Sequence, residues 1–380
     1  MSRVDVRWQR RLRVSRADDD PDWDDFLASH EHGHHTQTSL WSRVKASAGW
    51  SVTRVVAERG GVIVGGAQIL YRPFTGLGRA GYISMGPVLS RSDPGLVDEV
   101  ARAIRDAARD DRIRLVVVQP PVDSAFPADA ARGRADLPGI GDVAPRATIL
   151  VDVSRNPDEV LASMRPSTRY NTRVGRRKGI VVREGDGADV PAYHRMLRAT
   201  AERQSFSAFP ASYYVQMWRI LAPGGHIRLT FAECDGEPIA GQLAIVFGRT
   251  VVNKLSVWSG REGERRPNEA LQWDTITWAH AAGKERYDLE GIRVEAARAL
   301  LAGDPLPDRF KDTVTSYKLG FGGAVVVRPE PSLLVSNRAL DVAIRRLYPL
   351  VQQRAWAKRL QRRIRQGAAG PERRIGAAGP

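Results

Sequence analysis

The pattern of apolar and polar positions divides the first half of the chain into strands and helices. Residues 53–58 and 62–71 are rich in β-branched side chains and flank Arg59-Gly60-Gly61, which predicts a β-hairpin. Apolar residues at helical spacing over 97–110 lead into the apolar run 113–118, which predicts a helix followed by a buried strand. This alternation is typical of mixed α/β domains.

The second half repeats this order of elements. After Asn156-Pro157-Asp158, which marks a helix start or a domain boundary, come a helix, a hairpin closed by Asp235-Gly236-Glu237, another strand and a helix opened by Pro267. From the strand before the boundary onward, the predicted elements span residues 148–153, 191–204, 226–234, 238–247, 250–257 and 267–282. The repetition predicts an α/β (α+β) fold class in which one kind of mixed unit is used twice.

Length and composition favour two domains in a reducing compartment. A chain of 380 residues, 42% of them apolar, is long enough for two ordinary domains. The single cysteine, Cys234, excludes an intramolecular disulfide. The first twenty residues lack the apolar run of a signal peptide, and no run of about 18 apolar residues predicts a membrane span. We therefore expect a cytoplasmic protein, peripheral at the inner face of the membrane if its tail binds lipid.

Positive charge is concentrated in the C-terminal tail. The net charge is +15, and residues 337–380 hold eleven Lys and Arg against two acidic residues, so nine of the fifteen charges lie there. Within residues 351–380, Trp356, Leu360 and Ile364 predict the apolar face of a basic amphipathic helix, followed by a disordered Gly/Ala/Pro-rich end. Three partners for this tail stay open: anionic lipid, RNA and the body of the protein.

A second basic feature is a predicted helix opened by Pro166 and closed by Gly179. Its basic residues are Arg165, Arg169, Arg173, Arg176, Arg177 and Lys178, with no acidic residue among them. Four of the arginines are spaced by four residues and share one face, where like charges repel unless a polyanion compensates them. The stripe is therefore either a solvated basic face or a surface that binds tRNA or other phosphates.

Lys318 stands in the glycine-rich frame Tyr317-Lys318-Leu319-Gly320-Phe321-Gly322-Gly323 and is one of seven lysines among 58 basic residues. Lysine is a compact charge suited to one developing negative charge, whereas arginine suits bidentate recognition. Two interpretations of Lys318 therefore stay open on local sequence alone: a catalytic charge that stabilises a developing anion, or a surface lysine beside a turn.

Other catalytic chemistries find little support. The chain has no Gly-x-Ser-x-Gly motif, and Cys234 lies in a predicted strand as a packing residue. Four histidines between Leu27 and Gln37 have no cysteine or paired carboxylate at metal-ligand spacing nearby, so we expect a polar loop and no metal. They are His30, His32, His34 and His35.

Four motifs occur in order between Trp23 and Arg328. They are Gln37-x-x-x-Trp41-x-x-Val44-Lys45 with Gly49-Trp50, the arginine-rich segment 164–180, the segment from Pro267-Asn268-Glu269 to Tyr287-Asp288-Leu289-Glu290-Gly291-Ile292, and Tyr317-Lys318 with Phe321-Gly322. Together they resemble the FemABX family of aminoacyl-tRNA-dependent peptidyltransferases, which add amino acids to peptidoglycan precursors. The chain resembles the family's armless members, because it has no heptad run between Pro191 and Leu289.

The resemblance implies a fold and a domain division. The fold would be two tandem GNAT-like acyltransferase domains. Domain 1 would comprise residues 1–155 with about 318–350, domain 2 residues 156–317, and the basic tail residues 351–380. The chain would thus return to complete the first domain after Lys318.

The resemblance also implies roles for particular residues. Lys318, with Tyr317, would act at the reacting ester of aminoacyl-tRNA, and Lys45 would hold the diphosphate of the precursor. Tyr213, Tyr214 and Trp258 would line the acceptor channel. The full set of substrate-binding residues is Trp41, Lys45, Gln119, Tyr213, Tyr214, Trp258, Asn268, Asp288 and Glu290. Gln119 stands where the family often has an acid before proline, so an acid–base role at that position is not expected.

These features predict an aminoacyltransferase acting on an amine of a lipid- or UDP-linked peptidoglycan precursor. An aminoacyl ester is already activated, so proximity and one electrostatic group suffice without a covalent intermediate. Aminoacyl-tRNA would be a co-substrate, and no cofactor is expected. One alternative is an acyl-CoA-dependent N-acyltransferase, although the pyrophosphate-loop pattern at 176–181 lacks its last small residue. Further alternatives are an aminoacyl-tRNA-dependent transferase of secondary metabolism and a non-catalytic RNA- or membrane-binding protein.

Overall fold

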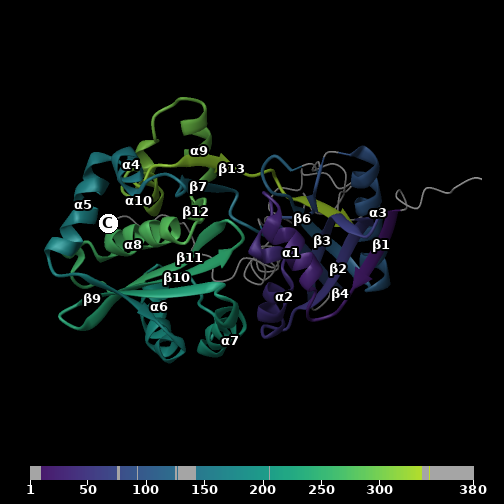
Figure 1. The fold of residues 1–380 in the computed structure, drawn as a ribbon, viewed down its shortest axis with the longest axis horizontal. Helices are drawn as coiled ribbons and strands as arrows, with labels where there is room; N and C mark the ends of the chain where they lie inside the picture. Colours follow the sequence, from purple (N-terminus) through teal and green to yellow (C-terminus); the bar gives the residue numbers. More distant parts are fainter. Residues whose placement is uncertain are drawn as a thin grey trace, which may run out of the picture. The chain divides into compact units, whose positions relative to one another are not determined.

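The structure, a computed structural model, describes residues 10–74, 78–91, 93–124, 126, 143–204, 206–335 and 342. These residues divide into two compact units, one made of the described residues up to Ala144 with residues 328–335, the other of the described residues within Pro145–Val327. Each unit is built on a seven-stranded sheet (Figure 1). The predicted mixed α/β class is confirmed.

The first unit has the strand order β1-β2-β3-β4-β6-β14, with β5 paired to β3. Its strands are β1 (Arg10–Ser15), β2 (Ser51–Arg59), β3 (Val62–Phe74), β4 (Gly78–Ser84), β5 (Val88–Leu89), β6 (Ile113–Gln119) and β14 (Ser332–Val335). Its helices are α1 (Pro21–Ser29), α2 (Ser39–Ala46) and α3 (Pro94–Asp110). The strands β4 and β6 are parallel, and α3 forms the crossover between them.

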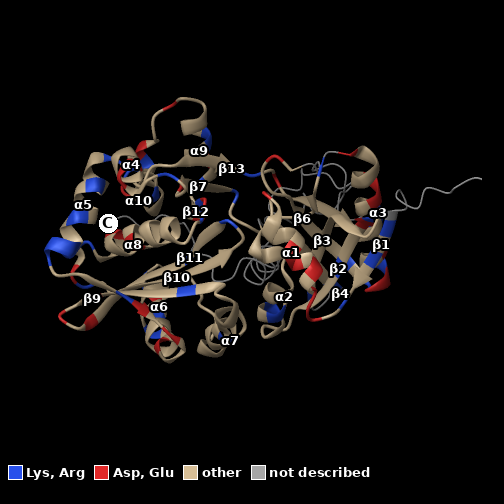
Figure 2. Ribbon diagram, viewed as in Figure 1, with Lys and Arg blue, Asp and Glu red and all other residues tan. Residues whose placement is uncertain are grey.

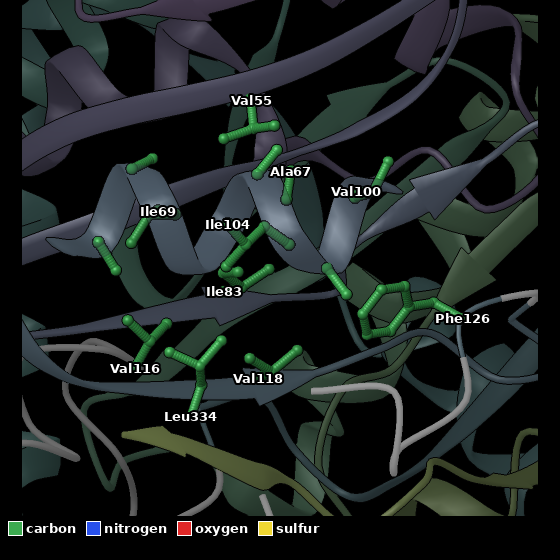
Figure 3. Close-up of a cluster of buried hydrophobic side chains, with 14 of the residues drawn as sticks. Val55, Ala67, Ile69, Ile83, Val100, Ile104, Val116, Val118, Phe126 and Leu334 are labelled. Carbon is green, nitrogen blue, oxygen red and sulfur yellow. The ribbon is translucent and has the colours of Figure 1, made fainter. Parts of the chain in front are cut away.

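Helix α3 covers one face of this sheet. Its apolar stripe includes Val100 and Ile104, which pack on the alternate strand residues that point to the same side, such as Ile69 and Val116 (Figure 3). Leu334 of β14 belongs to the same core, so a segment from the end of the chain completes the first unit.

The opposite face of this sheet is covered by α1 and α2 through polar groups as well as apolar ones. Gln37 accepts a hydrogen bond from the Gln68 backbone N–H at 2.7 Å and donates to the Ser84 carbonyl at 2.8 Å. The fully buried Arg54 donates to Gln68 Oε1 at 2.8 Å and to Ser42 Oγ of α2 at 2.8 Å. Because buried polar groups must be paired, this network fixes α2 on the sheet.

The second unit has the strand order β13-β7-β12-β11-β10-β9-β8. Its strands are β7 (Ala147–Asp152), β8 (Val181–Gly185), β9 (Ile227–Cys234), β10 (Glu237–Phe247), β11 (Thr250–Trp258), β12 (Arg286–Asp288) and β13 (Ala324–Val327). Its helices are α4 (Pro157–Ser163), α5 (Pro166–Arg177), α6 (Val190–Arg203), α7 (Ala211–Leu221), α8 (Pro267–Ala281), α9 (Val294–Leu301) and α10 (Val314–Leu319).

Helices cover both faces of the second sheet. Helices α4, α5, α8 and α10 lie on one side, and α6 and α7 on the other (Figure 1). The larger core is on the α8 side, where Ile276 and Ala279 of α8 pack with Val160 of α4 and Phe321 after α10. The predicted hairpin between β9 and β10 is present, and its turn residues Asp235 and Gly236 both have positive φ, 51° and 80°.

The boundaries between the units differ from those expected. The strand β7, expected in the first domain, is paired with β12 and β13 in the second sheet. Helix α10 with Lys318, and β13, also belong to the second unit, so the chain returns to the first unit at Arg328 and not at about 318. The unit to which β7 belongs is fixed by its pairing with β12 and β13, more than a hundred residues later in the chain. The apolar pattern of a strand does not reveal such a partner.

Two further expectations concern the arm and the tail. Among the described residues the longest helix is α3, with 17 residues, so this part of the chain contains no coiled-coil arm. The predicted amphipathic helix in 351–380 lies outside the described residues. None of the helices in the described part of the chain has the length and hydropathy needed to cross a membrane.

Candidate functional site

Two parallel strands separate at the centre of the second sheet. The parallel pairing of β11 with β12 covers Val251 with Tyr287 and Val252 with Asp288, and there it ends. The next residues of β11 include a bulge opposite Leu243 and Ala244 of β10, in which Lys254 is the extra residue. A bulge bends its strand and redirects a side chain. It places Lys254 in the middle of β11, two residues beyond its last pairing with β12 and beside the carboxyl end of β12. Ligands of open α/β sheets bind where neighbouring strands separate beyond such an end.

A tight turn follows β12 at the same edge. The Glu290 backbone N–H donates to Asp288 Oδ1 at 2.7 Å, and the Thr148 hydroxyl donates to the same oxygen. Glu290 has φ of 53°, a left-handed conformation that disfavours residues other than glycine by about 1–2 kcal/mol. Hydrogen bonds from Leu289 and Ile292 to β7 carbonyls hold the turn on both sides. A strained backbone fixed in this way is typical of functional sites.

Lys318 reaches this turn from α10. Its ammonium donates to the Glu290 carbonyl at 2.7 Å and to the Gly291 carbonyl at 2.9 Å. The Tyr317 ring, next to it on α10, packs edge-on against Phe321 with ring centroids 5.2 Å apart. The structure therefore brings Lys318 to the turn that contains Asp288 and Glu290, and Tyr317 anchors the helix that carries the lysine. The catalytic and substrate-binding roles of these residues stay predictions.

A second lysine, Lys254, meets the same turn and was not predicted. Its ammonium lies 2.7 Å from Glu290 Oε1, and both side chains are largely buried, at 16% and 18% exposure. The available signal was its rarity, because Lys254 is one of seven lysines in the chain. Two ammonium groups from different elements thus converge on one four-residue turn, residues 288–291, which we call the lysine-clamped turn.

Arg165 connects α5 to the helix that carries Lys318. Its guanidinium donates to the Ser316 hydroxyl at 3.3 Å and to the Ser316 carbonyl at 3.1 Å, and its backbone N–H donates to the Gly320 carbonyl at 3.0 Å. Arg165 therefore positions α10, a contact that the sequence did not predict, and its phosphate-binding role stays a prediction.

Gly320 is required by this close approach. A Cβ at this position would lie 2.2 Å from Thr168 Oγ1 and 2.8 Å from Arg165 Nη2. We expect Gly320→Ala to lower the free energy of unfolding by about 1–3 kcal/mol, because the added methyl group overpacks the contact between α5 and α10. Chemical denaturation measures the change. An unchanged midpoint and slope would contradict the close contact.

The other basic residues of α5 are directed outward. Arg173, Arg176, Arg177 and Lys178 are exposed, whereas Arg169 is half-buried and donates to the Ala162 carbonyl at 2.8 Å. Lys178 donates to the Glu264 carbonyl at 3.3 Å. The predicted stripe therefore has a first part, Arg165 and Arg169, that also bonds to neighbouring backbone, and a last part that is exposed and directed outward. Phosphate binding by these residues stays a prediction.

Lys45 and Trp41 are buried in the first unit. Lys45 is 0% exposed, and its ammonium lies 5.3 Å from the centre of the Trp41 ring, a cation–π contact. A diphosphate would reach this ammonium only after the surrounding side chains moved. The role of Lys45 as a precursor ligand stays a prediction.

Gln119 has a structural role that replaces the expected substrate contact. Its Oε1 accepts hydrogen bonds from the backbone N–H groups of Val143 and Ala144 at 2.9 and 2.8 Å, and its Nε2 donates to the Ala144 carbonyl at 3.1 Å. The side chain is fully buried. A glutamine fits here because a carboxylate cannot donate to the Ala144 carbonyl.

The predicted channel residues are not gathered at the lysine-clamped turn. Tyr213 and Tyr214 are buried on α7, on the opposite face of the sheet from α10 (Figure 1). Burial raises the pKa of the Tyr214 hydroxyl well above its usual range. Trp258, at the end of β11, donates from Nε1 to the Arg261 carbonyl at 2.8 Å, and Asn268 is half-buried in the first turn of α8. Contact of these four residues with an acceptor stays a prediction.

The first turn of α8 disfavours an anionic ligand. Helix N-termini attract phosphates through their free N–H groups and dipole. Here the first turn contains Glu269, which is 8% exposed and accepts a hydrogen bond from Asn171 Nδ2 at 3.2 Å. Burial raises the pKa of its carboxyl. The Glu269 side chain therefore already occupies the first turn of the helix, where a cofactor pyrophosphate would bind.

Neither the histidines nor the cysteine forms a reactive site. His35 packs edge-on against Trp41 with ring centroids 4.9 Å apart, and Cys234 is buried. Within the described ranges, no three His, Cys, Asp or Glu side chains gather in a way that would hold a metal ion.

Comparisons with known proteins agree with this architecture. The FemAB family model matches residues 19–128, and the acetyltransferase (GNAT) domain model matches residues 162–304. Lipid II:glycine glycyltransferase of Staphylococcus aureus is 24% identical over 227 residues, which is 56% of this chain and 53% of that protein. The same enzyme from strain bovine RF122 / ET3-1 is 25% identical over the same length. The chain thus spans about half the length of the curated relatives it matches.

A solved structure extends the likeness to the fold of nearly the whole chain. The crystal structure of FemX superimposes with a TM-score of 0.73 at 19% identity, covering 90% of this chain and 100% of the FemX chain. One family model falls in each structural unit, and the fold match spans both. Residues 19–128 of this protein thus match the FemAB family and residues 162–304 the GNAT acetyltransferase domain, which agrees with the FemABX-type tandem GNAT architecture expected from the sequence.

Proposed function

We propose that this protein is an aminoacyltransferase that moves an amino acid from aminoacyl-tRNA to an amine of a peptidoglycan precursor peptide. Its curated relatives are named as lipid II:glycine glycyltransferases. The observation that carries the proposal is the convergence of Lys254 and Lys318 on the lysine-clamped turn, at the carboxyl end of β12. The acceptor would be a lipid- or UDP-linked precursor.

The chemistry requires positioning and one stabilising charge. The acceptor amine attacks the carbonyl carbon of the aminoacyl ester, so a C–N bond forms and negative charge develops on the carbonyl oxygen. When the intermediate collapses, the C–O bond to the ribose breaks and the amine proton passes, directly or through water, to the leaving ribose oxygen. No histidine or cysteine is needed. A fixed ammonium near the developing oxyanion contributes the main electrostatic stabilisation.

The lysine-clamped turn supplies such a charge in a largely buried setting. The Lys318 ammonium is held by two carbonyl groups, which restrict its position without neutralising its charge. Lys254 forms an ion pair with the Glu290 carboxylate, and it thereby supports the residue whose carbonyl holds Lys318. We therefore assign the oxyanion-stabilising role to Lys318 and a positioning role to Lys254.

Aminoacyl-tRNA is favoured over acyl-CoA as the donor. In the strand–loop–helix unit from β11 to α8, the buried Glu269 occupies the first turn of the helix, where a pyrophosphate would bind. The exposed arginines of α5 instead offer a surface for a larger polyanion.

The direct test is donor exchange. The protein is incubated with total charged tRNA carrying labelled amino acids and with lipid- or UDP-linked muropeptides, with and without ribonuclease. We expect label in the muropeptide, and none after the tRNA is degraded. Transfer from labelled acyl-CoA that resists ribonuclease would replace this proposal with the acyl-CoA alternative. No transfer from either donor would favour a binding protein.

A further inference from the structure

We propose that the exposed end of α5 is a track for the single-stranded 3′ end of the RNA donor, with Tyr170 as a stacking platform for one of its bases. This inference rests on the proposed function, and it assigns a role to a residue that neither the sequence motifs nor the arginine stripe identified.

The charge of α5 is one-sided. No acidic residue occurs between Glu159 and Glu184, and the exposed side chains on the last turns of the helix are Arg173, Arg176 and Arg177. Basic residues line α5 without acidic interruption in Figure 2. Because like charges one turn apart destabilise a helix, a bound polyanion would stabilise this arrangement.

Tyr170 gives this basic helix an aromatic surface. It is 62% exposed, one of the few large apolar side chains left open in the described residues, and the Arg177 guanidinium carbon lies 5.6 Å from its ring centre. Proteins that bind single-stranded nucleic acid combine backbone-tracking cations with aromatic rings on which bases stack. A duplex is recognised mainly through its phosphates and shape, and offers no free base face to a ring.

The position of α5 links this platform to the proposed reaction centre. Arg165, at the start of α5, is bonded to Ser316 on α10, two residues before Lys318. From there α5 leads away for twelve residues, about 18 Å at 1.5 Å per residue, with Tyr170 within the first two turns. In an aminoacyl-RNA the ester is at the 3′ terminus, so a strand whose ester lies at Lys318 would pass Tyr170 within its first few nucleotides.

An anionic membrane fits this surface less well. A helix that lies in a bilayer interface needs a broad apolar face to insert. The non-basic face of α5, with Thr168, Thr172, Val174 and Gly175, is instead buried within the unit. What α5 presents outward is one ring among cations, which suits a single strand of RNA.

Binding of unacylated RNA tests the track separately from catalysis. Affinities are measured for a single-stranded RNA oligomer, a duplex of the same sequence, and phosphatidylglycerol vesicles. We expect Tyr170→Ala to weaken single-strand binding at least about fivefold, Tyr170→Phe to restore it, and duplex binding to stay unchanged. Arg173→Gln with Arg177→Gln is expected to lower the salt slope by about one for each phosphate that is no longer neutralised. Arg219→Gln, an exposed arginine on α7, is the matched control.

The outcomes separate this inference from the proposed function. Unchanged single-strand affinity in Tyr170→Ala, equal losses for strand and duplex, or binding to vesicles alone would overturn the track. Tyr170-dependent binding in a protein that transfers no amino acid would support the track and overturn the function. Normal amino-acid transfer together with RNA binding that does not depend on Tyr170 would support the proposed function and overturn the track.

Discussion

Replacing Lys318 with methionine is expected to slow aminoacyl transfer by about 100-fold or more, because the ammonium proposed to stabilise the tetrahedral oxyanion is removed. The loss is expected in kcat at saturating donor and acceptor, since the charge acts on the transition state. Single-turnover transfer of a labelled amino acid measures it. The variant also loses two hydrogen bonds to the lysine-clamped turn, so its unfolding midpoint is measured in parallel.

Lys311→Met is the matched control for this change. Lys311 is an exposed lysine of the same unit, paired with Asp308 at 2.6 Å, and lies outside the proposed site. We expect its transfer rate to equal that of the unchanged protein. Full activity of Lys318→Met, with any acyl donor, would remove Lys318 from the mechanism.

Replacing Lys254 with methionine is expected to slow transfer by about tenfold and to lower the free energy of unfolding by about 1–3 kcal/mol, because Glu290 loses the cation that pairs with its largely buried carboxylate. Lys254 acts through Glu290, whose carbonyl holds Lys318. Lys254→Met should therefore slow transfer less in the Glu290→Gln background, where the unpaired carboxylate charge is absent, than in the unchanged protein.

A double-mutant cycle measures this dependence. We expect a coupling between Lys254→Met and Glu290→Gln of about 0.5–3 kcal/mol in stability, with a coupling in kcat of the same sign. Lys284→Met, at a lysine that donates to the Gly248 carbonyl in the same unit, controls for loss of a lysine elsewhere. Additive effects of the two changes would show that the pair does not position Lys318.

The sequence allowed the centre of this site to be predicted in part. Lys318, Asp288 and Glu290 were all assigned to the substrate site from their motifs. In the structure Lys318 donates to the Glu290 and Gly291 carbonyls, and the Glu290 backbone N–H donates to Asp288. Lys254 was missed because its surroundings are those of an ordinary strand, and only the register with β10 shows that it stands in a bulge. A bulge depends on pairing between strands, which no local pattern encodes.

Long-range contacts also explain what the spacing of residues in the sequence did not show. Arg165 has the spacing of a phosphate-binding stripe, but its guanidinium also donates hydrogen bonds to Ser316, 151 residues later in the chain. Gln119 has the place of a family acid, but its amide is used by backbone groups of Val143 and Ala144. Spacing on a helix or strand predicts which face a side chain occupies, and the partner on that face comes from tertiary packing.

The most direct measurement is photo-crosslinking with a non-hydrolysable aminoacyl-RNA that carries a reactive group on its amino acid. If the ester lies at the lysine-clamped turn, peptide mapping will find the label within residues 288–291 and in α10, Val314–Leu319, and excess unmodified aminoacyl-tRNA will compete it away. Label confined to elements of the first unit, such as α2 or β6, would contradict the placement of the reaction centre at Lys318.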